Sequence, residues 1–388
     1  MKSYFSHLEC TNCGKIYPST EPIRTCLSCS KVIYARYDLE QAKSEVSKTI
    51  FSSRAPNMWR YFELLPVLDN NNIVSLGEGF TPIHKADNLG DNLGLSNLLI
   101  KDESFNPTAS FKARGMSAAV SKVKEFNIKE LTVPSAGNAG GALAAYAAKA
   151  GLQSHIFMPQ DAPEATQKEV SITNATLNLV DGFINDAGVQ SRGLANEKGM
   201  FDLSTLQEPY RAEGKKTMGY EIAEQLGWNL PDAIIYPTGG GTGIVGIWKA
   251  IKEMEQLGWI SGKRPKMFCI QAEGCAPLVQ AFNQKSRFAK AWANPKTIAA
   301  GMRVPSAIGD YLILDAVYES GGAAITVTDD EMIEYVKKTI AMEGLFLCPE
   351  GGATVCASKK LLDLGLINEK DSILLLNTGS GFKYMEVI

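Results

Sequence analysis

The chain has 388 residues, with 39 Lys and Arg against 42 Asp and Glu, a formal net charge of −3 and 45% hydrophobic residues. At about 150 residues per domain, this length suggests two or three domains with room for a sizeable hydrophobic core. The nearly balanced charge gives no support to binding of nucleic acid or of an anionic membrane surface. These values exclude a peptide-like module and indicate an ordinary globular protein.

The N-terminus gives no sign of export. Its first ten residues include Lys2, His7 and Glu9 and lack an apolar stretch of signal-peptide length, so we expect a cytoplasmic protein. The uncharged stretch 131–148 is rich in Gly and Ala rather than in Leu, Ile or Phe. It is too polar to span a bilayer, so we expect no membrane segment.

Four of the 8 cysteines form two close pairs, Cys10 with Cys13 and Cys26 with Cys29. A Cys-x-x-Cys turn directs two sulfurs at one point, and two such turns supply the four thiolates of a tetrahedral zinc ion. The spacing therefore predicts a structural zinc ribbon at residues 1–35. A ribbon that has lost its metal stays open, as does a pair of disulfides, which a reducing cytosol disfavours. Four protein ligands leave the metal no open position, so we expect no catalysis there.

After a connector of helical character at residues 37–72, short β-rich runs alternate with helical stretches. Such alternation predicts parallel sheets wrapped in helices. We expect strands at 98–100, 131–133, 155–158, 177–180, 233–236, 267–270, 324–327 and 373–376. Residues 216–228 and 329–342 carry apolar residues at helical spacing, and Thr328 or Asp329 is placed to cap the second helix.

Turns of glycine and other small residues follow three of these runs, at 134–138, 237–243 and 377–381. Ligands of open α/β sheets bind beyond the carboxyl ends of the strands, so three such turns indicate one shared site. The turn at 237–243 leads into a predicted helix at 244–254, whose N-terminal amides can hold a phosphate dianion. The alternative is a tight strand-to-helix turn without a ligand.

Lys112 follows a Pro-containing turn that begins at Asn106, and Ser110 is placed to cap the helix that starts there. Without the other motifs, the sequence around Lys112 indicates an ordinary solvated lysine. Near a phosphate-binding loop, it matches the requirement of a phosphorylated cofactor that is held as a Schiff base. Only 3 histidines are present and none lies in a motif, which argues against His-based triads and metal sites.

Six motifs resemble, in this order, the pyridoxal-phosphate enzymes of the tryptophan-synthase β fold, and among these the threonine synthases. They are Gly77–Pro82, Asn106–Gly115, Ser135–Asn138, Glu208–Thr217, Thr238–Gly243 and Thr378–Gly381. The resemblance covers about residues 76–383, and some threonine synthases also carry a four-cysteine ribbon. It implies an α/β fold with two parallel-sheet lobes and an active site in the cleft between them.

The resemblance also implies a division of the chain and an assembly. The large cofactor-binding domain would comprise residues 36–105 and 206–388, and the small domain residues 106–205. Related enzymes are commonly dimers, so we expect a homodimer.

The resemblance assigns most of the expected site to the cofactor. Lys112 would carry pyridoxal 5'-phosphate as a Schiff base and act as general acid and base. Asn138 would hydrogen-bond the ring hydroxyl, and Thr378 would face the pyridine nitrogen. The cofactor's phosphate would be held by Gly239, Gly240, Gly241, Thr242 and Gly243.

Two further positions are assigned to a small amino-acid substrate. Ser135 and the amides that follow it would receive the carboxylate, and Arg211 would grip a substrate phosphate with two parallel hydrogen bonds. The alternative for Arg211 is an ordinary salt bridge. The implied reaction converts O-phospho-L-homoserine and water to L-threonine and phosphate.

The chain departs from the threonine-synthase pattern at Ala109, Ala113, Ala136, Ala139 and Ser380. Around Lys112 and Asn138 it resembles the serine/threonine dehydratases instead. A dehydratase-like or β-replacing lyase that acts on another amino acid is therefore an alternative. A binding protein without activity is a third possibility, against which the intact Lys112, Asn138 and glycine loop argue.

Overall fold

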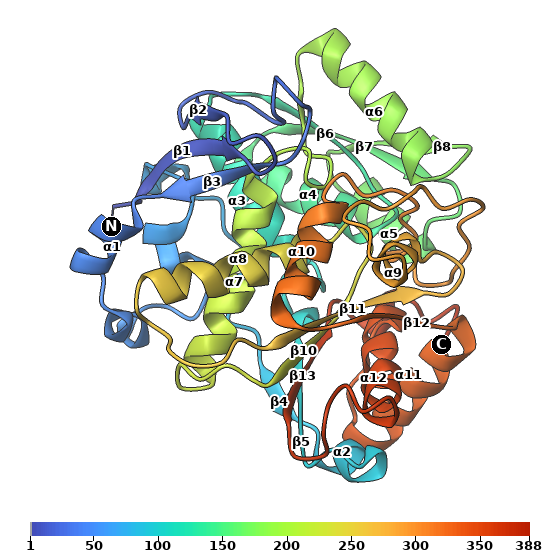
Figure 1. The fold of residues 1–388 in the computed structure, drawn as a ribbon. Coiled ribbons are helices and arrows are strands. Elements are labelled where there is room, and N and C mark those ends of the chain that lie inside the picture. Colours follow the sequence, from blue (N-terminus) through green and yellow to red (C-terminus); the bar gives the residue numbers. More distant parts are fainter. Residues whose placement is uncertain (1) are drawn as a thin grey trace.

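The computed structural model describes residues 2–388, and these contain three sheets (Figure 1). The N-terminal sheet has the order β2-β1-β3 and is antiparallel. Its strands are β1 (Phe5–Cys10), β2 (Ile16–Pro18) and β3 (Ile33–Tyr37). The predicted connector follows as α1 (Leu39–Glu45) and the 3-10 helices Lys48–Ser53, Met58–Leu64 and Asn70–Asn72.

The largest sheet has the order β12-β11-β10-β13-β5-β4 and is parallel except at the β4 edge. Its strands are β4 (Ile83–Lys85), β5 (Asn97–Asp102), β10 (Ala233–Pro237), β11 (Lys266–Ala272), β12 (Ala324–Val327) and β13 (Ser372–Asn377). Strands β10 and β13 are almost continuously buried, as is typical of parallel strands covered on both faces.

The third sheet, of order β8-β7-β6-β9, is entirely parallel. It consists of β6 (Glu130–Pro134), β7 (Gln153–Pro159), β8 (Thr176–Val180) and β9 (Phe201–Asp202). A strand is present at every β-rich run in which one was predicted. The strands β4 and β9 were not predicted, because three and two residues give no readable alternation.

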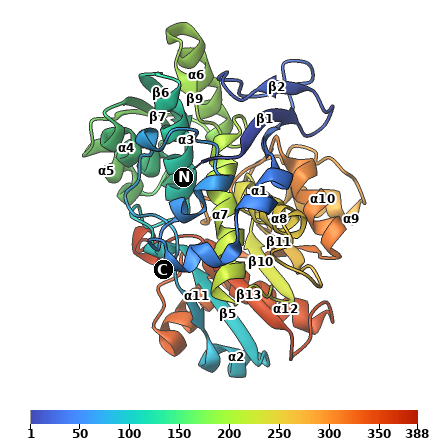
Figure 2. The same cartoon turned by 90° about the vertical axis from the view of Figure 1, so that its left-hand side faces the viewer.

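Helices cover both parallel sheets. They are α2 (Asp87–Leu93), α3 (Lys112–Glu125), α4 (Asn138–Ala150), α5 (Glu164–Ser171), α6 (Ile184–Lys198), α7 (Tyr210–Gln225), α8 (Thr242–Gln256), α9 (Pro277–Asn283), α10 (Asp310–Ser320), α11 (Asp329–Glu343) and α12 (Pro349–Asp363), with 3-10 turns at Glu103–Phe105 and Gly381–Lys383. Helix α7 packs against α3 and α8 and runs through the middle of the molecule (Figure 2).

Two predicted caps had different outcomes. Thr328 caps α11 in a capping box, since its hydroxyl accepts from the Glu331 amide and the Glu331 carboxylate accepts from the Thr328 amide. The prediction for Ser110 was wrong: Phe111 precedes α3, and the Ser110 hydroxyl has no partner among the described residues. The Ser110 backbone instead bridges to Gly379.

Figures 1 and 2 place the N-terminal sheet at the same end of the molecule as α6, with α2, α11 and α12 at the opposite end. The four-stranded sheet lies within residues 130–202 and the six-stranded sheet within 83–102 and 233–377. The exact domain limits stay a prediction. Within residues 2–388, no helix combines the length and apolar character that crossing a membrane requires.

Candidate active site

A cavity lies where β6, β10 and β13 end and where α3, α4 and α8 begin. The predicted small-residue turns all contribute to its wall, and so does Lys112. The lining residues taken from these turns and helix starts are Lys112, Pro134–Ala139, Pro237, Gly239–Gly243 and Thr378. The carboxyl ends of parallel strands thus meet helix N-termini at one place, where a ligand of an α/β protein is expected.

Lys112 is the first residue of α3 and is half-buried. Its Nζ lies 4.0 Å from the centroid of the Phe111 ring. Burial and the nearby Arg211 guanidinium lower the pKa of this amine to about 7, while the Glu350 carboxylate acts in the opposite direction. A substantial fraction of Lys112 is therefore neutral near pH 7, as a nucleophilic amine must be.

The glycine loop, Gly239–Gly243, connects β10 to α8. Gly241 has φ +79°, and a Cβ at Gly239 would overlap the Gly301 carbonyl oxygen, so both positions require glycine. No side chain caps the N-terminus of α8. Its first amides are therefore free donors at the positive end of a 15-residue helix, which is the environment that a phosphate group needs.

Asn138 begins α4 and connects it to the C-terminal segment. Its Nδ2 donates to the Tyr384 hydroxyl at 2.9 Å, and its Oδ1 accepts from Lys383 Nζ at 3.2 Å. Tyr384 is buried and lines the cavity. The side chain predicted to orient a cofactor ring is thus itself held from two sides.

Ser135 and Thr378 lie in the cavity wall and have partners within the protein. The Ser135 hydroxyl accepts from the Gly137 amide at 3.0 Å and from the Gly140 amide at 2.8 Å. The Thr378 carbonyl accepts from the Phe111 amide, and its hydroxyl lies 3.8 Å from the Cys348 thiol. These hydrogen bonds hold in place the two segments of the cavity wall that contain Ser135 and Thr378.

Arg211, predicted to hold a substrate phosphate, lies near the cavity but not in its wall. It sits in the first turn of α7 and is 1% exposed. Its Nη1 donates to the Leu203 carbonyl at 2.5 Å and contacts the Thr205 hydroxyl at 3.4 Å. Its Nε has no partner within the part of the chain that the structure describes, so donor capacity remains.

Glu350, the acidic side chain of the cavity wall, was not predicted from the sequence. It is 4% exposed, and its Oε1 accepts from the Gly301 amide at 2.8 Å. Its Oε2 is buried and unpaired within residues 2–388. A glutamate after Pro349 looks like an ordinary helix start, so only the fold brings it beside Lys112. Tyr384, in a segment without a motif, was missed for the same reason.

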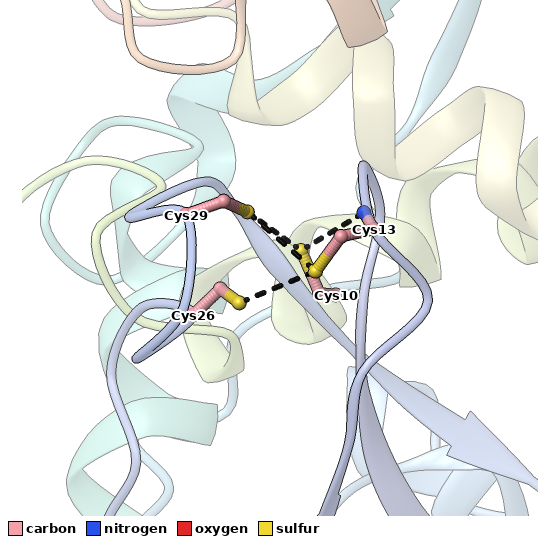
Figure 3. Close-up of side chains that lie close together, drawn as sticks. All are labelled: Cys10, Cys13, Cys26 and Cys29. Carbon is pink, nitrogen blue, oxygen red and sulfur yellow. Dashed lines mark hydrogen bonds between the residues drawn. The ribbon is translucent and has the colours of Figure 1, made fainter.

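The four N-terminal cysteines converge, and all their sulfurs lie within 4.8 Å of one another (Figure 3). Sulfur–sulfur separations include 3.5 Å between Cys10 and Cys29 and 3.6 Å between Cys13 and Cys26. A tetrahedral ion with Zn–S bonds of about 2.3 Å requires about 3.8 Å between sulfurs. The cluster therefore has the chemistry and dimensions of a zinc site.

The family model for pyridoxal-phosphate dependent enzymes matches residues 74–379. The chain belongs to this family. The geometry agrees with the cofactor, because an amine with a lowered pKa, a glycine loop and a free helix N-terminus line one cavity. The residues of the cavity wall are therefore compatible with the cofactor chemistry of this family.

Among its relatives is the threonine synthase of Methanocaldococcus jannaschii, 38% identical over 96% of this chain and 92% of that protein. The threonine synthase of Mycobacterium tuberculosis is 32% identical over 83% of this chain and 87% of its own.

The fold is also similar to solved structures. Maize serine racemase matches with a TM-score of 0.66 and 22% identity over 78% of this chain and 88% of the racemase. Threonine deaminase isoform 2 of Solanum lycopersicum matches with a TM-score of 0.66 and 20% identity over 79% of this chain and 82% of the deaminase. At such identities the likeness concerns the fold alone.

Proposed function

We propose that the protein is a threonine synthase that converts O-phospho-L-homoserine and water to L-threonine and phosphate. The observation that carries the proposal is the 38% identity to a threonine synthase over 96% of the chain. The placement of Lys112 beside the glycine loop supports it, because the reaction needs one amine next to a phosphate-anchored cofactor.

Pyridoxal phosphate, when bound, supplies the conjugated ring that makes the Cα and Cβ hydrogens of the substrate acidic. The glycine loop and the first amides of α8 would hold its phosphate, and Asn138 its ring hydroxyl. The hydroxyl of Thr378 would face the ring nitrogen. Lys112 would accept the proton from Cα and then that from Cβ, for which a pKa of about 7 suits it.

The substrate would be held by groups at the edge of the same cavity. Ser135 and the amides at the start of α4 would receive the carboxylate, since Gly137 supplies no side-chain cap to α4 and the Ser135 hydroxyl holds the Gly140 amide but not those of Asn138 and Ala139. Arg211 would donate its unpaired Nε to the substrate phosphate. The phosphate would leave from Cγ, Cγ would take up a proton to become the methyl group, water would add at Cβ, and return of a proton to Cα would complete the reaction.

The direct test is to measure phosphate and L-threonine released from O-phospho-L-homoserine by the cofactor-loaded protein. We expect the two products in equal amounts. L-serine and L-threonine should be run beside it, with 2-oxoacid as the readout. Formation of 2-oxoacid without phosphate release would contradict the proposal.

One observation favours a second candidate, an eliminating lyase. Arg211 directs Nη1 at the Leu203 carbonyl rather than into the cavity. A substrate without a phosphate would need no such group, and the same assay distinguishes the two.

Lys112→Ala should abolish the reaction while the fold persists. One amine provides both the covalent link to the cofactor and the proton transfers, so we expect turnover to fall by at least about 10³-fold. The loaded variant should also lack the visible absorbance of a lysine Schiff base. Circular dichroism provides the control for folding. Turnover that stays within tenfold of the parent would remove Lys112 from the mechanism.

We also propose that Cys10, Cys13, Cys26 and Cys29 bind one structural zinc ion. The convergence of the four sulfurs supports this assignment. Metal analysis of the purified protein should give one zinc per chain, and a protein folded fully without metal would contradict it. The cytoplasmic location and the homodimer stay predictions from the sequence.

A further inference from the structure

Among the contacts between the ribbon, residues 1–35, and the rest of the molecule, two lead toward the glycine loop. At the first, Nη1 of Arg24 forms an ion pair of 2.9 Å with Oδ2 of Asp202, at the end of β9. The Asp202 side chain is completely buried. Its other oxygen accepts from the Ser204 amide at 2.9 Å and from the Ser204 hydroxyl at 2.6 Å. Arg24 is thus paired with the carboxylate that shapes the segment Asp202–Thr205.

This segment ends against the glycine loop. A Cβ at Gly240 would lie 2.6 Å from Cγ2 of Thr205, so the threonine methyl group fills the space beside that glycine. Thr205 also lines the cavity. Between these two ends, the Leu203 carbonyl accepts from Arg211. One short segment therefore connects the ribbon's arginine to the wall of the phosphate-binding loop.

The second contact runs through α10. The hydroxyl of Thr11, next to the ligand Cys10, lies 2.5 Å from the hydroxyl of Tyr311. Tyr311 is buried in α10. Two residues further along, the Ile313 side chain occupies the place that a Cβ of Gly241 would take. Gly240 therefore packs against the segment Asp202–Thr205, and its neighbour Gly241 packs against α10. The ribbon contacts both of these segments.

We propose that Arg24 is a positioning residue for the phosphate group of the cofactor, and that the ribbon couples its own folding to cofactor binding through Asp202 and Thr205. Amides bind a phosphate well only when held in place beforehand, because ordering the loop on binding costs free energy. Without Arg24, the buried Asp202 carboxylate loses the cation that pairs with it directly, and the segment that carries Thr205 relaxes to solvate it. The coupling is reciprocal, so the cofactor also stabilises the ribbon.

The inference rests on the proposed function only in taking pyridoxal phosphate as the cofactor. Its test is the affinity of the cofactor-free full-length protein for two probes, pyridoxal phosphate and pyridoxal, which lacks the phosphate. The variants are Arg24→Ala, Arg24→Lys and Arg36→Ala. Arg36 is the matched control, because it pairs with Glu9 at 2.7 Å within the N-terminal sheet and does not reach the cavity.

For Arg24→Ala we expect the Kd of pyridoxal phosphate to rise about fivefold or more, the lower range of measured couplings between sites. The Kd of pyridoxal should stay within twofold. Arg24→Lys, which retains the charge, should restore part of the loss, and Arg36→Ala should match the parent for both probes. Zinc content and thermal unfolding show whether the ribbon of each variant is intact.

If Arg24→Ala binds pyridoxal phosphate and pyridoxal equally more weakly than the parent, the effect is generally structural and the inference is overturned. Equal Kd values of Arg24→Ala and Arg36→Ala for pyridoxal phosphate would also overturn it. If Arg24→Ala loses its zinc, Tyr311→Phe tests the second contact instead. We expect the Kd of pyridoxal phosphate to rise in this variant while that of pyridoxal does not. An unchanged Kd of pyridoxal phosphate would overturn the inference. A parent protein that binds neither probe would instead overturn the proposed function.

Discussion

The environment of one amine decides what the cavity can do. Lys112 is half-buried and faces the positive charge of Arg211, and both effects disfavour its protonated form. Glu350 is the opposing charge, and its position in the wall limits how far the pKa falls. The balance places the pKa near 7, where one amine can both donate and accept a proton.

The rate of cofactor capture should therefore depend on pH around 7. Only the neutral amine forms the Schiff base, and the neutral fraction rises about tenfold between pH 6 and pH 8 for a pKa of about 7. Stopped-flow absorbance of the cofactor-free protein mixed with pyridoxal phosphate measures this rate. In Glu350→Gln the midpoint should lie at lower pH, because the charge that raises the Lys112 pKa is removed. A rate that still climbs steeply at pH 9 would contradict the assigned pKa.

A second amine, Lys215, is buried without a hydrogen-bond partner in the described part of the chain. It lies between α7 and α3, since a Cβ at Gly115 would be 2.6 Å from its Nζ. Burial, Arg211 and Lys112 lower its pKa well below the ordinary value. The unfolded chain binds this proton up to about pH 10.5 and the folded chain does not, so stability rises with pH over that window.

Lys215→Met should raise the free energy of unfolding at pH 7 by about 1 to 3 kcal/mol, the cost of a buried unpaired polar group. The gain should shrink toward pH 10, where the parent no longer gives up a proton on folding. Urea denaturation at pH 7 and pH 9.5 measures both values. Unchanged stability together with loss of cofactor capture would instead assign Lys215 to the site.

At the scale of elements, the sequence determines more of the fold than of the site. Apolar runs such as Ile373–Leu376 and the small residues after them place the parallel strands and their turns, because burial and backbone geometry are local properties. Glu350, Tyr384 and Thr205 enter the cavity only through tertiary packing. The cap predicted at Ser110 failed for a related reason, since its backbone pairs with Gly379 from the far end of the chain.

Helix α3, which carries Lys112, is fixed by one fully buried guanidinium. Arg114 pairs with Glu103 at 2.6 Å and with Glu221 of α7 at 2.5 Å. Arg114→Met should destabilise the fold by about 3 to 5 kcal/mol, because it leaves two buried carboxylates with too few partners. Arg114→Lys keeps the charge but loses the planar fork, so we expect a smaller loss. Urea denaturation measures both, and equal stability of Arg114→Met and the parent would contradict this role.

At the scale of the whole molecule, two ion pairs join the predicted small domain to the large one beside the cavity. Arg303 holds Asp161 through two hydrogen bonds of 2.7 and 2.8 Å, and Lys383 holds Glu169 at 2.7 Å. Arg303 follows the wall residues Ala300 and Gly301. Sites between two lobes commonly close on their substrate, and such pairs would favour the closed arrangement.

Arg303→Ala should therefore weaken substrate binding without affecting the fold. The Asp161 side chain is 60% exposed, and exposed pairs contribute about 0.2 to 1 kcal/mol, so KM for O-phospho-L-homoserine should rise by at most about fivefold. Arg287→Ala is the matched control, because its two-bond pair with Asp315 lies within the large domain. In about 1 M salt the Debye length is about 3 Å, so the difference between parent and Arg303→Ala should largely disappear. Equal effects of the two arginine variants, or a difference that persists in high salt, would show that this pair does not control closure.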